Sequence, residues 1–117
     1  MENTWTRKIG GIELSFKDLA ESNTVPFVFG ELENDYYGLE QIRLSPEDTV
    51  IDIGANVGMF SIYVKKKFGC KVIAFEPTSF QLGLLKDNVE LNNLGDRLKE
   101  HYNDLNINFE DEEPFDE

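Results

Sequence analysis

The segment from Thr49 to Glu76 most constrains the fold of this chain, because it reads as an apolar strand, a glycine turn, a helix and a second apolar strand. The first apolar run ends at Asp52 and is followed by Gly54 and Gly58. Glycine permits positive φ and lets the backbone approach a ligand without a Cβ in the way. The following helix directs the positive end of its dipole to the same place. This order predicts an α/β domain with a parallel sheet and a ligand cradle at the turn.

The spacing of the glycine and acidic residues narrows the class of ligand. The second apolar run ends at Glu76, 18 residues after Gly58, and an acid about 20 residues beyond such a turn reaches ribose hydroxyls. A dinucleotide-binding turn has the pattern G-x-G-x-x-G, whose middle glycine makes room for pyrophosphate. Here Asn56 occupies that place, and the pattern is D-x-G-x-x-x-G. A ligand with ribose and adenine but no phosphate fits better, which favours S-adenosylmethionine over NAD.

Three stretches carry a family resemblance. Residues 52–58 read Asp-Ile-Gly-Ala-Asn-Val-Gly, residues 75–77 read Phe-Glu-Pro, and residues 84–93 read Leu-Leu-Lys-Asp-Asn-Val-Glu-Leu-Asn-Asn. In this order they resemble the cofactor-binding half of FkbM-type S-adenosylmethionine-dependent methyltransferases. The resemblance implies a Rossmann-like fold and methyl transfer to an oxygen of a small molecule or sugar, with a base taking the hydroxyl proton.

The turn, the spacing and the resemblance together give a set of expected cofactor-binding residues. The catalytic base is not assigned. The only histidine, His101, has no Cys or acidic partner at a recognised metal-binding spacing, so no metal site is expected. The expected cofactor site consists of Asp52, Gly54, Ala55, Asn56, Gly58, Glu76, Pro77 and Asn103.

These residues also have purely structural interpretations. Asp52 could cap the helix or bind turn amides, and Glu76 could simply favour the dipole of the next helix. The two glycines and Asn103-Asp104 could be ordinary turn residues. Cys70 is expected to be a small packed residue. A group of aromatic residues is expected in the core or as a cap over it, namely Phe27, Phe29, Tyr36 and Tyr37.

The length of 117 residues is enough for one domain. The resembled family has a seven-stranded sheet, so we expect the acceptor-binding half to be missing from this chain. The chain would then be a natural remnant, a shortened piece of a longer protein, or a domain whose other half a partner supplies. The expected organisation is a truncated Rossmann-like domain over 1–109, with a β-rich extension over 1–45 packed on it. Residues 110–117 are expected to form an acidic disordered tail.

Three functional hypotheses follow. The first is a methyltransferase domain that is inactive if its acceptor half is absent. The second is a non-catalytic acidic interaction protein derived from a methyltransferase. The third, an NAD-binding fragment, is weakened by Asn56. For assembly, we expect a homodimer or completion by another chain.

The composition and charge argue against two kinds of partner, nucleic acids and membranes. The net charge is −12, and six of the 23 acidic residues lie in 110–117. The basic cluster Lys65–Lys67 falls in the last turn of a predicted helix, where it neutralises carbonyl partial charge, so nucleic-acid binding is not expected. No apolar run approaches the roughly 18 to 20 residues of a membrane span. The single cysteine fits a reducing compartment. We therefore expect a soluble cytoplasmic protein that does not bind membranes.

The N-terminal third is predicted from turn signals. Gly10-Gly11 separates two short strands, 5–9 and 12–16, which indicates a hairpin. Residues 24–29 are predicted as an edge strand that tolerates Pro26. Residues 31–44 have helical spacing that Gly38 interrupts.

The elements around the glycine turn are predicted from apolar periodicity. Residues 49–53 suit a strand covered on both faces, and 57–68 suit a helix that ends at Gly69. A strand follows at 72–75. Thr78 and Gln81 form a capping box for a helix with a buried stripe of Phe80, Leu84, Leu85 and Val89. A third strand is expected at 97–102.

Overall fold

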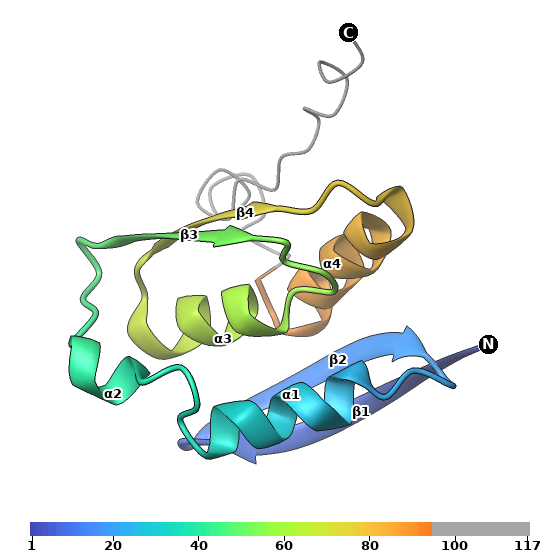
Figure 1. The fold of residues 1–117 in the computed structure, drawn as a ribbon, viewed down its shortest axis with the longest axis horizontal. Helices are drawn as coiled ribbons and strands as arrows, with labels where there is room; N and C mark the ends of the chain where they lie inside the picture. The colour runs from blue at the N-terminus through green and yellow to red at the C-terminus, as the bar shows by residue number, and fades with distance from the viewer. Residues whose placement is uncertain (95–117) are drawn as a thin grey trace, which may run out of the picture.

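The computed structural model describes residues 1–94, in which an antiparallel hairpin and two helices precede a strand-helix-strand-helix unit (Figure 1). This order confirms the predicted α/β fold class. The elements are β1 (Glu2–Ile9), β2 (Ile12–Leu19), α1 (Thr24–Glu33), α2 (Leu39–Ile42), β3 (Thr49–Ile53), α3 (Met59–Phe68), β4 (Lys71–Phe75) and α4 (Ser79–Leu91).

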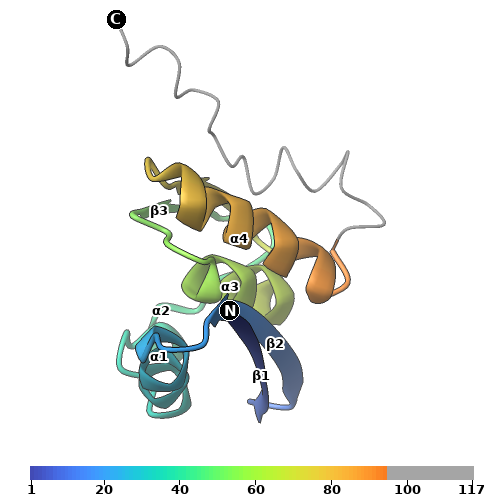
Figure 2. The same cartoon turned by 90° about the vertical axis from the view of Figure 1, so that its right-hand side faces the viewer.

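Two separate pairs of strands enclose helix α3. β1 and β2 pair antiparallel, with Ile9 opposite Ile12 across the turn, and Gly10 and Gly11 both have positive φ, as a two-residue hairpin turn requires. β3 and β4 pair parallel, with Ile51 opposite Ile73. Figure 2 shows α3 between the parallel pair and the hairpin. Within residues 1–94, no helix is long and apolar enough to cross a membrane.

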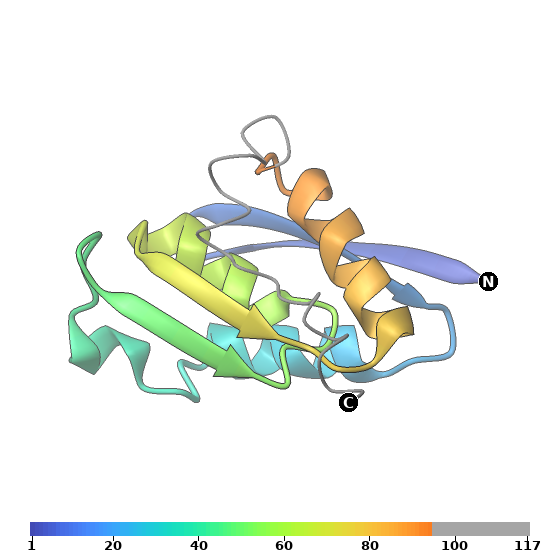
Figure 3. The ribbon, with the colours of Figure 1, turned by 90° about the horizontal axis from the view of Figure 1, so that it is seen from above.

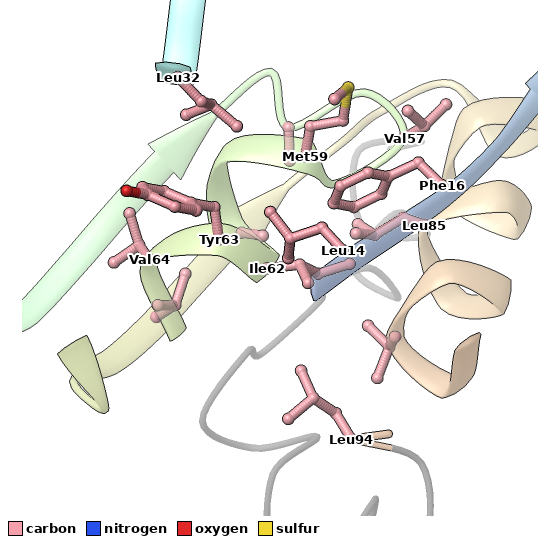
Figure 4. Packing of buried hydrophobic residues seen from close by; sticks show 14 of the residues in the cluster. Leu14, Phe16, Leu32, Val57, Met59, Ile62, Tyr63, Val64, Leu85 and Leu94 are labelled. Atoms are coloured by element: carbon pink, nitrogen blue, oxygen red, sulfur yellow. The ribbon is translucent and has the colours of Figure 1, made fainter. Parts of the chain in front are cut away.

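The core lies where the hairpin meets α3 and α4. Leu14 and Phe16 of β2, Ile62 of α3 and Leu85 of α4 are fully buried, and Figure 4 shows these side chains gathered together. Burying one such side chain contributes about 1.5–3 kcal/mol. Helix α3 ends at Gly69 in the left-handed conformation, with φ 73°, as predicted from the sequence.

The prediction of a strand at 24–29 is wrong, because this segment begins helix α1. The run of branched and aromatic residues has strand propensity, but Val25, Phe29 and Leu32 share one helical face and are all buried. The rings of Phe29 and Phe16 lie 5.7 Å apart between centroids. Pro26 is tolerated because it lies in the first turn, where its missing N–H is not needed. Tertiary burial therefore overrides the local preference.

Helix α4 begins and ends close to the predicted residues and buries three of the four side chains predicted for its buried stripe. Thr78 is the N-cap residue, yet its side chain makes no capping hydrogen bond, so the predicted capping box is not formed. Leu84, Leu85 and Val89 are buried as expected, whereas Phe80 is 47% exposed. The buried face also includes the amide of Asn88, which is fully buried.

The side chains of Asn88 and Asn92 bind the backbone of β2 as a neighbouring strand would. Lys17 N–H donates to Asn88 Oδ1 (2.8 Å), and Asn88 Nδ2 donates to the carbonyls of Lys17 (3.2 Å) and Val57 (2.9 Å). Asn92 repeats the pattern at Ser15, whose N–H it accepts at 2.9 Å and whose carbonyl it binds at 2.7 Å. The two amides thus join the hairpin to α4, and Asn88 also reaches the glycine turn.

Replacing Asn88 by Leu should destabilise the protein by at least about 2 kcal/mol, because leucine fills the space but leaves buried backbone groups of Lys17 and Val57 without partners. Urea unfolding followed by circular dichroism measures the change. Glu90→Leu, on the exposed side of the same helix, is the matched control and should change stability by less than about 0.5 kcal/mol. Equal stability of the two variants would contradict the role of the amide.

One face of the parallel pair is uncovered within the described residues. Ile51 and Ile53 are 59% and 81% exposed, and Phe75 is 40% exposed, so the prediction that β3 is covered on both faces is wrong for residues 1–94. Figure 3 shows β3 and β4 side by side and running in the same direction. β4 is the strand that pairs with β3 in this part of the chain. The predicted third strand and the acidic tail lie outside the described residues.

Within residues 1–94, β3 pairs with a strand on one edge only, and its other, open edge can pair with another molecule. Residues 24–29 could have covered this edge as a strand, but they form α1 and do not pair with β3. We expect a second molecule of this chain to pair with it. The Asp48 carbonyl accepts from Lys71 N–H, and Gly54 N–H donates to the Phe75 carbonyl. Since strand residues alternate the edge to which their backbone groups point, the N–H of Ile51 faces away from β4.

We therefore expect a dimer in sedimentation experiments, and we expect Ile51→Pro to weaken it by removing a donor at the open edge while the fold is kept. The matched variant is Ile73→Pro, at the register partner of Ile51. The same alternation turns the Ile73 N–H toward β3, so this variant should unfold the parallel pair. A stable parent monomer would contradict self-association.

Candidate functional site

The site is built around the turn between β3 and α3, which the end of β4 holds in place. Gly54 and Ala55 both donate their N–H groups to the carbonyl of Phe75, each at 2.9 Å. Gly54 and Gly58 have positive φ, and so does Asn56, with φ 57°. Asparagine tolerates this conformation better than most residues. The two hydrogen bonds to Phe75 and these positive φ values therefore define the backbone conformation of the turn.

The two glycines of the turn serve different purposes. A Cβ on Gly58 would overlap the Cδ1 atom of Leu85, whereas a Cβ on Gly54 would meet nothing within 4 Å. Gly58 is thus required for the packing of α4 against the turn. The open side of Gly54 leaves space in which a ligand can approach the backbone.

Glu76 fastens the turn to the start of α4. Its Oε1 accepts the N–H of Asn56 at 2.6 Å, and its Oε2 accepts the N–H of Thr78 at 3.1 Å. Each carboxylate oxygen can accept a further hydrogen bond. Pro77 is exposed beside it. The structural interpretation of Glu76 and its expected ribose contact are therefore compatible.

Asp52 lies at the end of β3 and is held by a serine of α3. Ser61, which is fully buried, donates its hydroxyl to Asp52 Oδ2 at 2.6 Å. Burial raises the pKa of Asp52 above its ordinary value of 3.8, the Ser61 hydrogen bond opposes this, and the negative charge of Glu76 adds to the rise. The sequence analysis did not identify Ser61, because nothing in its local pattern distinguishes it from other helical serines.

A pocket of about 350 Å³ opens beside the turn. Besides Asp52 and residues of the turn, its walls include residues from helix α1 and from the segment before α2. Neither lysine nor arginine is among the lining residues in the described part of the chain. The lining residues are Thr24, Val28, Tyr37, Asp52, Gly54, Ala55, Asn56, Val57, Met59 and Phe60.

Four of the expected cofactor residues line this pocket, and others lie next to it. Asp52, Gly54, Ala55 and Asn56 are in its wall. Glu76 adjoins it through its bond to Asn56, while Gly58 faces the core. Asn103, with His101, lies outside the described residues. No group of three or more possible metal ligands occurs within residues 1–94.

Two aromatic residues in the wall of the pocket are not predicted from the sequence. Tyr37 is expected in the core or as a cap over it, but it lines the pocket together with Phe60. Their ring centroids are 4.9 Å apart. The approach of Tyr37 to the turn depends on how α1 packs against the hairpin, and no local signal in the sequence reports that packing.

Comparisons with known proteins show partial similarity to methyltransferases. Over 68 residues the chain is 35% identical to methyltransferase sdnD of Sordaria araneosa, a match of 56% of this chain and 26% of that protein. Over 51 residues it is 37% identical to methyltransferase 1 of Beauveria bassiana, a match of 42% of this chain and 20% of that protein. No protein-family model matches the chain.

A solved structure shows the same fold. A Pyrococcus horikoshii protein described as a candidate transferase matches 80% of this chain and 34% of its own, with a TM-score of 0.54 and 23% identity. The chain thus spans about a quarter or less of the curated methyltransferases named above. It is a methyltransferase-like partial domain. Its hairpin and strand-helix-strand-helix unit form part of a Rossmann-like fold.

Replacing Asp52 by Asn should stabilise the protein at neutral pH. The pKa of Asp52 is raised in the folded state, so its contribution to stability is complete below 3.8 and is lost as the pH rises through the folded pKa. Asparagine stays neutral and can still accept the Ser61 hydrogen bond. Urea unfolding over a pH series should show a higher free energy of unfolding for the variant than for the parent at neutral pH. This difference should shrink toward acidic pH. A difference that does not vary with pH would contradict the assignment.

Proposed function

We propose that this chain binds S-adenosylmethionine and is related to the FkbM-type O-methyltransferases. The observation that carries the proposal is the pocket beside the glycine turn, which combines a carboxylate and aromatic rings with no basic residue among its described lining. A dinucleotide brings two phosphates, and these favour sites with cationic or free amide partners. The amides of Gly54, Ala55 and Asn56 are already bonded within the protein.

The residues present fit this cofactor. The open side of Gly54 admits a ligand against the backbone, and Glu76 keeps acceptor capacity for ribose hydroxyls beside the turn. When bound, S-adenosylmethionine supplies a methyl group on a positively charged sulfur for transfer to a nucleophilic oxygen. The protein's part is to hold and orient it and to exclude water.

Tyr37, which lines the described site, is not suited to act as a general base at neutral pH. Tyr37 donates its hydroxyl to Glu31 Oε1 at 2.7 Å, and burial together with this bond raises the pKa of Tyr37 to about 12. Asp52 accepts the Ser61 hydroxyl. A base needs a pKa near the working pH. We propose that residues 1–94 bind the cofactor and that the acceptor site and the base lie outside these residues.

Calorimetric titration with S-adenosylmethionine, S-adenosylhomocysteine and NAD tests the proposal. The parent protein should bind S-adenosylhomocysteine and not NAD. Glu76→Ala should weaken that binding by about 10- to 150-fold, the loss expected for a charged hydrogen bond. Glu90→Ala, which removes an exposed acid of α4, is the control and should bind as the parent does. Absence of binding of both S-adenosylhomocysteine and S-adenosylmethionine, or tighter binding of NAD, would refute the proposed function and favour an interaction protein.

A further inference from the structure

The pocket has an aromatic wall that the glycine turn does not require. Tyr37, from the segment between α1 and α2, packs against Phe60 of α3 with the rings inclined by 62°, and both residues line the pocket. Tyr36 meets Tyr37 edge-on at 5.4 Å but is not among the pocket's lining residues. Two aromatic rings thus lie on the side of the pocket formed by the N-terminal segment and α3.

Tyr37 is held in a fixed position. Its hydroxyl donates to Glu31 of α1 at 2.7 Å, and its ring is bounded by Tyr36 and Phe60. The hydroxyl therefore stays protonated and points to a carboxylate. A phenol whose oxygen donates to an anion offers an electron-rich ring, and the negative face of such a ring attracts cations.

The charges around the pocket have the same sign. Asp52 lines the pocket, and Glu31 stands behind Tyr37. The negative charges of Glu31 and Asp52 both oppose ionisation of Tyr37. With no lysine or arginine among the lining residues in 1–94, this site favours a positively charged ligand over a neutral one of the same shape.

The pocket adjoins the expected ribose site. Asn56 donates its N–H to Glu76 at 2.6 Å and also lines the pocket. A ligand whose ribose is held by Glu76 therefore has its ribose next to the pocket. In S-adenosylmethionine the sulfonium is attached to that ribose, one carbon from the ring.

We propose that Tyr37, Phe60 and Asp52 recognise the positive charge of the sulfonium, so that the pocket binds S-adenosylmethionine more tightly than S-adenosylhomocysteine. This inference rests on the proposed function. The two ligands differ by one methyl group and by the charge of the sulfur, which is neutral after methyl transfer. A site of this kind holds the methyl donor and releases the spent product.

Isothermal titration of both ligands into the parent protein and three variants tests the inference. The parent should bind S-adenosylmethionine about 3- to 30-fold more tightly than S-adenosylhomocysteine, the range that a cation–aromatic contact supplies. Tyr37→Leu should reduce this ratio to below half of its parent value, mainly by weakening S-adenosylmethionine. Tyr37→Phe should keep more of the ratio than Tyr37→Leu does, because the ring remains although its hydrogen bond to Glu31 is lost. Tyr36→Leu is the matched control, since its ring lies next to Tyr37 but outside the pocket lining.

The outcomes separate this inference from the proposed function. If the parent binds both ligands equally, or if Tyr37→Leu weakens both to the same extent, charge recognition is refuted while cofactor binding stands. If the parent binds neither ligand, the proposed function fails and the inference with it. If Tyr37→Leu does not fold, Asp52→Asn provides a second test. This variant removes a negative charge from the pocket and should lower the preference for S-adenosylmethionine over S-adenosylhomocysteine.

Discussion

The buried amide of Asn88 is the interaction on which the rest of the structure most depends. It bonds to both backbone groups of Lys17 in β2 and to the carbonyl of Val57 in the glycine turn. A buried amide is costly unless its hydrogen bonds are made. The hairpin, the turn and α4 are therefore fixed to one another, because sliding any of them would leave buried polar groups without partners.

The position of the hairpin in turn decides the shape of the pocket. Phe16 of β2 packs on Phe29 of α1, and Arg7 of β1 lies over the same ring, 5.2 Å from its centroid. Helix α1 carries Thr24 and Val28 to the pocket, and Glu31 at its far end holds Tyr37. The lining of the pocket is thus set by an N-terminal segment as well as by the glycine turn.

The parallel pair of strands has one packed face and one exposed face. Its helix-covered side is well packed, with Val72 and Ala74 fully buried, whereas Ile51 and Ile53 on the other side are mostly exposed. Parallel sheets are generally covered on both faces. The exposed face agrees with a partial domain, since the chain covers only 34% of the Pyrococcus protein that has the same fold.

Features that rest on backbone constraints could be predicted from the sequence. The hairpin turn at Gly10-Gly11 and the helix end at Gly69 lie where they were predicted, and all three glycines have positive φ, which few other residues adopt readily. The strand order and the position of Glu76 beside the turn followed from apolar runs and spacing. These signals are local, so they can be read without knowing what each segment packs against.

Only the tertiary structure decided which side chains face one another. Residues 24–29 form a helix because Val25 and Phe29 are buried against other elements, and strand propensity is too weak to oppose that. Asn88 gained its role from a residue 31 positions away, whereas Ser61 gained its role from Asp52 and Tyr37 from the pocket that it lines. Hydrogen-bond satisfaction and burial depend on the whole packed chain, so the contacts that shape the site could not be found from local pattern.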